Sequence, residues 1–193
     1  MVSPARSPAL ETARLALLPL GRRDLPQALA LFREPFVRRY LFDDEIVSRE
    51  RAGDLLDRSE RDFRERGCGL WSVALKGTGE AVGFCGLLFP EEPEGSGEDP
   101  DPPEVVFALT ERHTGKGYAT EAARAVLGHG FGACGLPRVA ASVDNPNVAS
   151  QAVLERLGFV LRRRDEARGL LFYGLSREEF EAGPAGRPSA GRG

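Results

Sequence analysis

With 193 residues, the chain is long enough for one domain with a substantial core and too short for two domains of ordinary size. Its formal charge of −3 argues against a general nucleic-acid binder, because such proteins neutralise phosphates with clusters of Lys and Arg. No apolar run is long enough to span a bilayer, and the first residues lack the apolar stretch of a signal peptide. We therefore expect a cytoplasmic protein that has neither nucleic acid nor a membrane as its partner.

The first half of the chain predicts a strand, two helices and a hairpin. Residues 12–20 alternate as a strand does, whereas residues 24–32 and 48–66 space their apolar side chains as amphipathic helices do. Residues 70–76 and 81–89 are predicted strands, and the glycines between them suit the tight turn of a hairpin.

The second half of the chain alternates strands with helices. We expect strands at residues 104–110, 138–143, 159–164 and 169–175 and helices at residues 116–131 and 147–157. This alternation implies parallel pairing through helical crossovers, beside the antiparallel hairpin. The expected fold is a single α/β domain with a mixed sheet and helices on its faces.

The domain is expected to span residues 11–180. Residues 1–10 are predicted to be a flexible start, and residues 181–193 a disordered tail. Residues 91–103, EEPEGSGEDPDPP, carry six acids and no base, so we predict a mobile acidic loop. It is either a solvated insertion between strands or a means of attracting a cationic substrate.

The three cysteines give no sign of a disulfide framework or a metal site. Cys68, Cys85 and Cys134 are odd in number and widely spaced, and no two of them form a C-x-x-C pair. We expect free thiols in a reducing compartment and no metal. His129, near the end of a predicted helix, is expected to have no catalytic role.

The stretch RHTGKGYAT, residues 112–120, places Gly115 and Gly117 between a predicted strand and a predicted helix. A helix start has unpaired N–H groups and a partial positive charge, and glycines let a phosphate approach them closely. A P-loop would need glycine at Thr110, and a dinucleotide fingerprint would need it at Thr120, so neither motif fits. The alternative is a plain glycine turn that lets the helix fold back over the sheet.

The segment from Arg112 to Gly117 matches the R/Q-x-x-G-x-G/A signature for acyl-CoA, and the chain resembles the GNAT superfamily of N-acetyltransferases. ETARLALLPL, GKGYATEA, DNPNVAS and LERLGF are similar to its ribosomal-protein (Rim-type) branch, from about residue 11 to residue 180. The resemblance implies a mixed, mostly antiparallel sheet of seven strands with a V-shaped splay between its central parallel strands. It also implies acetyl-CoA as co-substrate, with the pyrophosphate on main-chain amides of Arg112, His113, Thr114, Gly115, Lys116, Gly117, Tyr118, Ala119 and Thr120.

Glu104 is the candidate base. An amine must lose a proton before or during acyl transfer, and a half-buried carboxylate at the start of a strand is suited to accept it. The resemblance supports Glu104 in this role, and a solvated acid at a strand edge is the alternative. It further implies that a main-chain amide near Ala108 stabilises the thioester oxygen and that the pantetheine arm pairs with the main chain around Leu109 and Thr110.

Asn147 and Ser150 are the candidates beyond the glycine-rich turn. Asn147 is a natural N-cap with Ser150 one turn later, and capping would explain it fully. The resemblance implies instead that Asn147 contacts the cofactor and that the Ser150 hydroxyl protonates the departing thiolate. Many superfamily members carry an acidic tyrosine where this chain has Leu154, so release without an enzymic acid is also open.

The expected function is direct transfer of an acetyl group from acetyl-CoA to a primary amine, of a protein N-terminus or of a small molecule. The alternative is a non-catalytic acyl-CoA-binding sensor or interaction module. Residues 33–69, which would frame the acceptor, match no recognisable motif. Arg124 and Arg156 are expected on solvated helix faces, and the alternative is that they reach the 3′-phosphate of the cofactor. A homodimer is possible.

Overall fold

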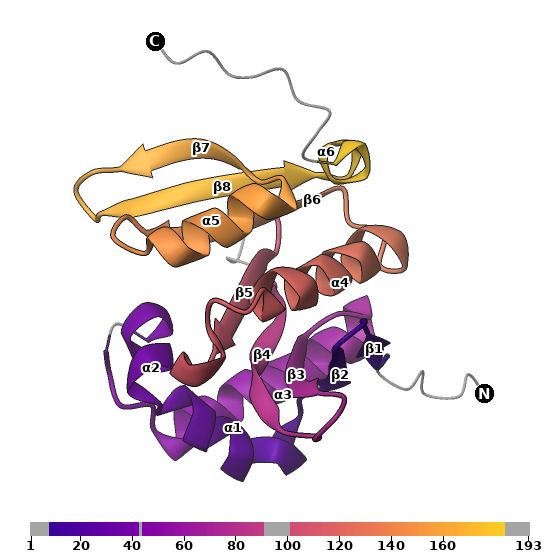
Figure 1. Ribbon diagram of the computed structural model, residues 1–193, viewed down its shortest axis with the longest axis vertical. Helices are drawn as coiled ribbons and strands as arrows, with labels where there is room; N and C mark the ends of the chain where they lie inside the picture. Colours follow the sequence, from indigo (N-terminus) through magenta and orange to yellow (C-terminus); the bar gives the residue numbers. More distant parts are fainter. Residues whose placement is uncertain (1–7, 43, 91–100, 184–193) are drawn as a thin grey trace.

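The computed structural model describes residues 8–42, 44–90 and 101–183 (Figure 1). The strands are β1 Leu10–Glu11, β2 Leu15–Pro19, β3 Leu70–Leu75, β4 Ala81–Leu88, β5 Glu104–Leu109, β6 Arg138–Asp144, β7 Val160–Asp165 and β8 Leu170–Ser176. The helices are α1 Leu25–Phe32, α2 Pro35–Leu41, α3 Arg49–Arg66, α4 Tyr118–Gly132, α5 Val148–Leu157 and α6 Arg177–Ala182, with short 3₁₀ turns η1 at Arg22–Asp24 and η2 at Glu111–His113. Within these ranges, no helix is both long and apolar enough to cross a membrane.

The strands form one mixed sheet in the order β1-β2-β3-β4-β5-β6-β8-β7. All neighbours pair antiparallel except β5 and β6, which are parallel. The mixed, mostly antiparallel α/β fold is therefore confirmed, with eight strands instead of the expected seven. The additional strand is β1, and its two residues are too few to show an alternation of apolar and polar side chains.

β5 and β6 touch at only one end. Their register contains one pair, Glu104 with Ala140, beside a hydrogen bond from the Ala140 N–H to the Pro103 carbonyl (2.9 Å). Beyond this point the two strands diverge, while β6 pairs with β8 along its whole length. The V-shaped splay expected from the resemblance is thus present, and it leaves the facing edge of β5 without a partner strand.

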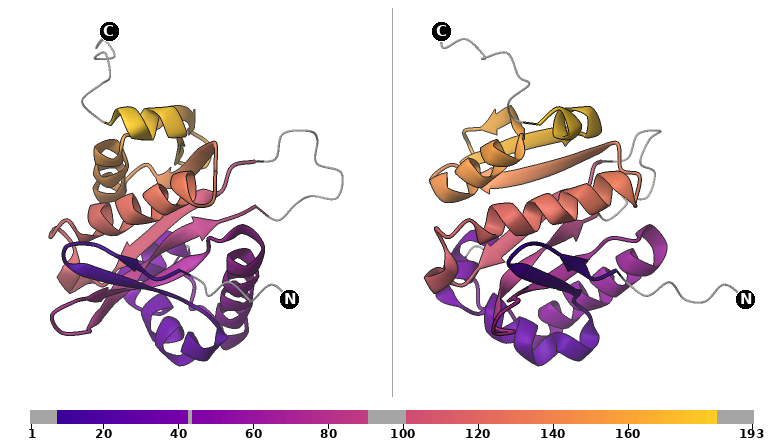
Figure 2. Two further views of the ribbon diagram at one scale, coloured as in Figure 1. Left: turned by 90° about the vertical axis from the view of Figure 1, so that its right-hand side faces the viewer. Right: turned by 45° about the vertical axis from the view of Figure 1, so that its right-hand side comes forward.

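Helices cover both faces of the sheet (Figure 2). α4 packs on one face, where its apolar side chains meet Val105 and Leu109 of β5 in the larger core. α1, α2 and α3 cover the other face, where a second core includes Val106 and Ala108. Neighbouring residues of β5 therefore project to opposite sides of the sheet, as the pleat of a strand requires.

Most predicted elements are confirmed within a few residues, but β1, α2 and α6 were missed. α2 is short and begins with Pro35. For α6, the only sequence pattern that indicates a helix is the capping box of Ser176 and Glu179. Of the predicted flexible start, residues 1–7 lie outside the described residues, and Leu10 belongs to β1. Most of the predicted acidic loop (residues 91–100) and of the predicted tail (residues 184–193) also lies outside the described residues.

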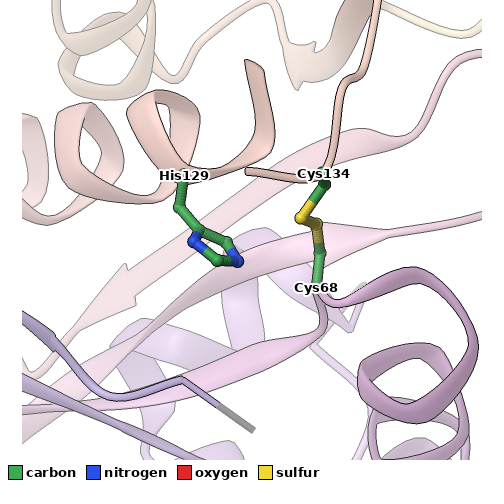
Figure 3. Close-up of side chains that lie close together, drawn as sticks. All are labelled: Cys68, His129 and Cys134. Carbon is green, nitrogen blue, oxygen red and sulfur yellow. A yellow bond between two sulfur atoms is a disulfide. The ribbon is translucent and has the colours of Figure 1, made fainter. Parts of the chain in front are cut away.

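The prediction of three free thiols is wrong, because Cys68 and Cys134 form a disulfide. Spacing could not reveal it, since the two cysteines are 66 residues apart and meet only when the end of α3 packs beside the end of α4. His129 lies beside them (Figure 3). Its Nε2 atom is 2.8 Å from the Gly67 carbonyl oxygen. Cys85 is free and buried, and burial raises the pKa of its thiol. Because disulfides are rare in reducing compartments, the expectation of a cytoplasmic location loses its support from the cysteines.

Candidate active site

A cavity of about 1220 Å³ occupies the opening between β5 and β6. The first turn of α4, α5 and α2 form its other walls. The cavity thus passes from the α4 face of the sheet to the α2 face through the splay. Many of the residues predicted for the site meet here, namely Glu104, Ala108, Leu109, Thr114, Gly115, Gly117, Tyr118, Ala119, Thr120, Asn147 and Ser150.

The start of α4 presents unpaired main-chain N–H groups to this cavity. Gly115 and Gly117 have φ of 71° and 80°, in the left-handed region that favours glycine, and Gly117 is the N-cap without a side chain to cap the helix. No acceptor in the described part of the chain bonds the amides of residues 115–120, and the first return bond runs from the Glu121 N–H to the Gly117 carbonyl. Such a helix start can bind an anionic group.

The residues just before this turn have a different role from the one predicted. The amides of His113 and Thr114 donate to the carbonyls of Thr110 and Glu111, so they are not free for a phosphate. The Arg112 guanidinium pairs with Glu80, and His113 Nδ1 is 2.7 Å from the Thr110 hydroxyl. Thr110, Arg112, His113 and Lys116 do not line the cavity. The structure therefore narrows the candidate phosphate contacts to the unbonded amides of residues 115–120, and of these residues Gly115 and 117–120 line the cavity.

Arg14 lies just before β2 and was not predicted to belong to the site. Its side chain nevertheless holds the turn at the start of α4 in place. Its Nη1 donates to the Lys116 carbonyl (3.0 Å), its Nε donates to Glu121 (2.6 Å), and its guanidinium lies 4.5 Å from the centre of the Tyr118 ring. Thr12 also donates to Glu121 (2.6 Å). Burial alone would raise the pKa of Glu121, but these hydrogen bonds and the charge of Arg14 bring it below its ordinary value. Glu121 is thus held as a carboxylate that fixes Arg14 against the turn.

The unpaired edge of β5 exposes only some of the main-chain groups near Ala108. The Thr110 N–H donates to the Val82 carbonyl (2.9 Å), and the Pro103 carbonyl accepts from β6. Because antiparallel strands alternate the direction of their N–H and C=O groups, Ala108 turns its amide toward β4, while Phe107 and Leu109 turn theirs toward the splay. The candidate donor near Ala108 is thus the amide of Phe107 or Leu109, and the Thr110 amide is already bonded within the sheet.

Glu104 lies at the point where the two strands separate. It is half-buried, lines the cavity and accepts a hydrogen bond from the Ser142 hydroxyl of β6 at its Oε2 atom (3.0 Å). Its Oε1 bonds no residue in the described ranges. By the alternation of the strand, Glu104 projects to the same face as Val106 and Ala108, toward α2. One carboxylate oxygen is therefore oriented by Ser142, and the other is free to accept a proton.

Asn147 and Ser150 lie together on the wall that α5 provides. Asn147 is buried and caps the helix, because its Oδ1 accepts from the Ser150 N–H (3.1 Å). Both residues nevertheless line the cavity, so capping does not exclude a contact with a ligand. Leu154 also lines it and is fully buried, which leaves Ser150 as a hydroxyl on this helix that faces the opening.

Several lining residues were missed or set aside by sequence reasoning. Phe36 and Tyr40 of α2 line the α2 side, with ring centres 5.7 Å apart. Arg124 and Arg156 are exposed, as predicted, and they also line the α4 side, where an Arg124 nitrogen donates to the Arg156 carbonyl (3.1 Å). Their helical position was readable from the sequence, but the direction of the face depends on how α4 and α5 pack.

Comparison with known proteins agrees with this architecture. Residues 14–160 match the acetyltransferase (GNAT) domain. The uncharacterized protein YkkB of Bacillus subtilis (strain 168) is 32% identical over 150 residues, which are 77% of this chain and 83% of YkkB. The acetyltransferase from Agrobacterium tumefaciens str. C58 superposes with a TM-score of 0.70 at 28% identity, covering 87% of this chain and 94% of that one.

The ribosomal L7/L12 α-N-protein acetyltransferase RimL, solved in complex with coenzyme A, has the same fold. Its TM-score is 0.69 over 88% of this chain and 98% of RimL, at 17% identity, a likeness that concerns the fold alone. The family match covers most of the sheet and both walls of the splay. The chain therefore belongs to the GNAT family and is an N-acetyltransferase.

Proposed function

We propose that this chain binds acetyl-CoA in the splay and transfers the acetyl group directly to a primary amine that enters from the α2 side. The observation that carries the proposal is the set of unbonded amides at the start of α4, where Gly115 and residues 117–120 line the same 1220 Å³ cavity as Glu104. The GNAT family uses acetyl-CoA, and RimL was solved with coenzyme A.

The residues present suit this co-substrate. A pyrophosphate needs several N–H donors at close range, and the first turn of α4 offers them with glycines that keep side chains away. Arg124 and Arg156 supply positive charge on the same side of the sheet. The pantetheine arm contains amides that pair like a strand, and the β5 edge at Phe107 and Leu109 provides complementary groups.

Three groups of the chain carry the chemistry in this proposal. Glu104 accepts the proton that the amine loses, directly or through a water, as the new N–C bond forms and the C–S bond breaks. A main-chain N–H of Phe107 or Leu109 stabilises the negative charge that develops on the carbonyl oxygen. Ser150 donates a proton to the departing thiolate and regains one from solvent, while Asn147 orients it through the helix cap.

Glu104→Gln tests the role of the base. The variant keeps the shape and the hydrogen bond from Ser142 but cannot take the proton, so kcat should fall by about 10²-fold or more. Calorimetry should show the dissociation constant of acetyl-CoA within about twofold of the wild type, because the amides of residues 115–120 are untouched.

Glu111→Gln is the matched control, since this carboxylate does not line the cavity. It should leave both quantities unchanged. Unaltered turnover in Glu104→Gln would remove Glu104 from the mechanism. Binding of coenzyme A by the wild type without acetylation of any amine would favour the sensor or interaction module instead.

A further inference from the structure

The wall that α2 contributes to the cavity points to the chemical class of the acceptor. Phe36, Tyr40 and Leu41 line the cavity from this helix. Opposite them lie Val106 and Ala108 of β5, on the face that α2 covers. The chamber in front of Glu104 is therefore walled largely by apolar and aromatic side chains.

The charges in this chamber are acidic. Glu104 and Asp144 line the cavity, and Asp144 lies two residues beyond Ser142, on the same face of β6. Among the lining residues within the described ranges, the cations are Arg124 and Arg156, which come from the opposite face of the sheet. Arg38 and Arg39 belong to α2 but do not line the cavity, and Arg38 pairs with Asp44 (2.8 Å).

These features select against a carboxylate on the acceptor. A carboxylate placed beside the amine would enter a chamber with no described cation to pair with and two acids to repel it, at a high desolvation cost. The amine itself is favoured, because Glu104 attracts its ammonium form. The ammonium loses one proton to solvent, and Glu104 accepts the second as the N–C bond forms. The remaining contact surface suits an apolar or aromatic body, which the Phe36 and Tyr40 rings can pack against.

We propose that the acceptor is a hydrophobic primary amine with no carboxylate next to its amino group, an inference that rests on the proposed acetyl transfer. An arylalkylamine and the N-terminus of a peptide with an apolar first residue share this chemistry. A free amino acid lacks it because of its carboxylate, and a polyamine lacks it because its further charges would be placed against apolar walls.

A panel of amines with one shared skeleton tests the proposal on the unmodified protein. Thiol release from acetyl-CoA is measured with phenethylamine, phenylalanine, a peptide beginning with phenylalanine, and spermidine. We expect kcat/KM for phenethylamine or for the peptide to exceed that for phenylalanine and for spermidine by about tenfold or more. The ratio of phenethylamine to peptide then distinguishes the two sources.

A preference for phenylalanine or spermidine would overturn the inference, and so would the absence of turnover with every hydrophobic amine. Calorimetry with coenzyme A on the same preparation separates this failure from that of the proposed function. No coenzyme A binding defeats the proposed function itself, whereas binding with turnover of a different amine class defeats only the acceptor inference.

Phe36→Ala connects the preference to the α2 wall. It should lower kcat/KM for phenethylamine by about tenfold and leave KM for acetyl-CoA unchanged within twofold, because Phe36 belongs to the α2 wall and the proposed phosphate contacts are amides at the start of α4. Leu18→Ala removes an exposed apolar side chain on β2 and is the matched control, with no expected effect on either constant. Equal effects of the two variants on phenethylamine would contradict the assignment.

Discussion

The two ends of α4 differ in how their main-chain groups are satisfied. At its start, the amides of residues 115–120 bond no described residue, and the turn opens on the cavity. At its end, where a helix leaves carbonyls unpaired, those of His129 and Gly130 accept from the N–H groups of residues that follow the helix, and the disulfide ties Cys134 to Cys68. One end is left open to a ligand and the other is closed within the protein. We infer that the first turn serves binding and the last turn serves stability.

Breaking the disulfide should have the largest effect. It should lower the free energy of unfolding without changing the affinity for acetyl-CoA. Cys134→Ser should lower the free energy of unfolding by up to about 4 kcal/mol, the entropy of closing a loop of this length. The dissociation constant of acetyl-CoA should stay within twofold. Urea unfolding and calorimetry measure the two quantities.

The double variant Cys68→Ser/Cys134→Ser controls for side-chain packing. Each single change breaks the same disulfide. The free energy of unfolding of the double variant should therefore be no lower than that of the less stable single variant. A double variant that loses the sum of the two single losses in unfolding free energy would contradict the account. So would three reactive thiols in the denatured, unreduced wild type, where only that of Cys85 is expected.

Gly117→Ala should act at the opposite end, on binding. An alanine at φ 80° costs about 1 to 2 kcal/mol, and its Cβ would lie 3.4 Å from an Arg14 nitrogen. The turn should therefore shift and weaken acetyl-CoA binding by about tenfold, as measured by calorimetry. Gly128→Ala is the control in the same helix, where an added Cβ meets nothing within 4 Å. It should raise stability by about 0.5 to 1 kcal/mol without changing the affinity, and a loss of affinity there would break the comparison.

Arg14→Gln should give a smaller effect on the same turn. Losing the bond to the Lys116 carbonyl and the pair with Glu121 should weaken acetyl-CoA binding by roughly threefold to tenfold, since the turn becomes less ordered. Arg51→Gln removes a comparably exposed guanidinium that pairs with Glu45, and neither of these residues lines the cavity. If the two variants bind acetyl-CoA equally well, Arg14 does not position the turn.

Acid should weaken the interaction between Arg14 and Glu121, and the stability that this interaction contributes should fall with the pH. Because the folded pKa of Glu121 lies below its ordinary value, the stability that this carboxylate contributes is present above the ordinary pKa and is lost as the pH falls through the folded one. The contribution is thus complete near neutral pH. Comparing urea unfolding of the wild type and Glu121→Gln across the acid range should show the difference shrinking as the pH falls, and a constant difference would oppose this role.

The sequence allowed most of the fold to be predicted, and it located the glycine-rich turn at the start of α4, which lines the cavity. The glycines at positions 115 and 117 act through the main chain, so their effect is local and readable. Three features were not readable. The direction of the β5 amides depends on register with β4, the α2 wall depends on a short helix without a motif, and the disulfide joins segments far apart in the chain. Each depends on tertiary packing, which local patterns do not encode.

The most direct test of the binding turn is a titration of ¹⁵N-labelled protein with acetyl-CoA, followed through its amide resonances. Our account predicts that the amides of residues 115–120 shift most, while those of Thr110, His113 and Thr114, which already donate within the protein, shift little. Pantetheine, which lacks the pyrophosphate, should leave residues 115–120 nearly unmoved. Unchanged resonances at residues 115–120 under saturating acetyl-CoA would contradict the claim that this turn binds the co-substrate.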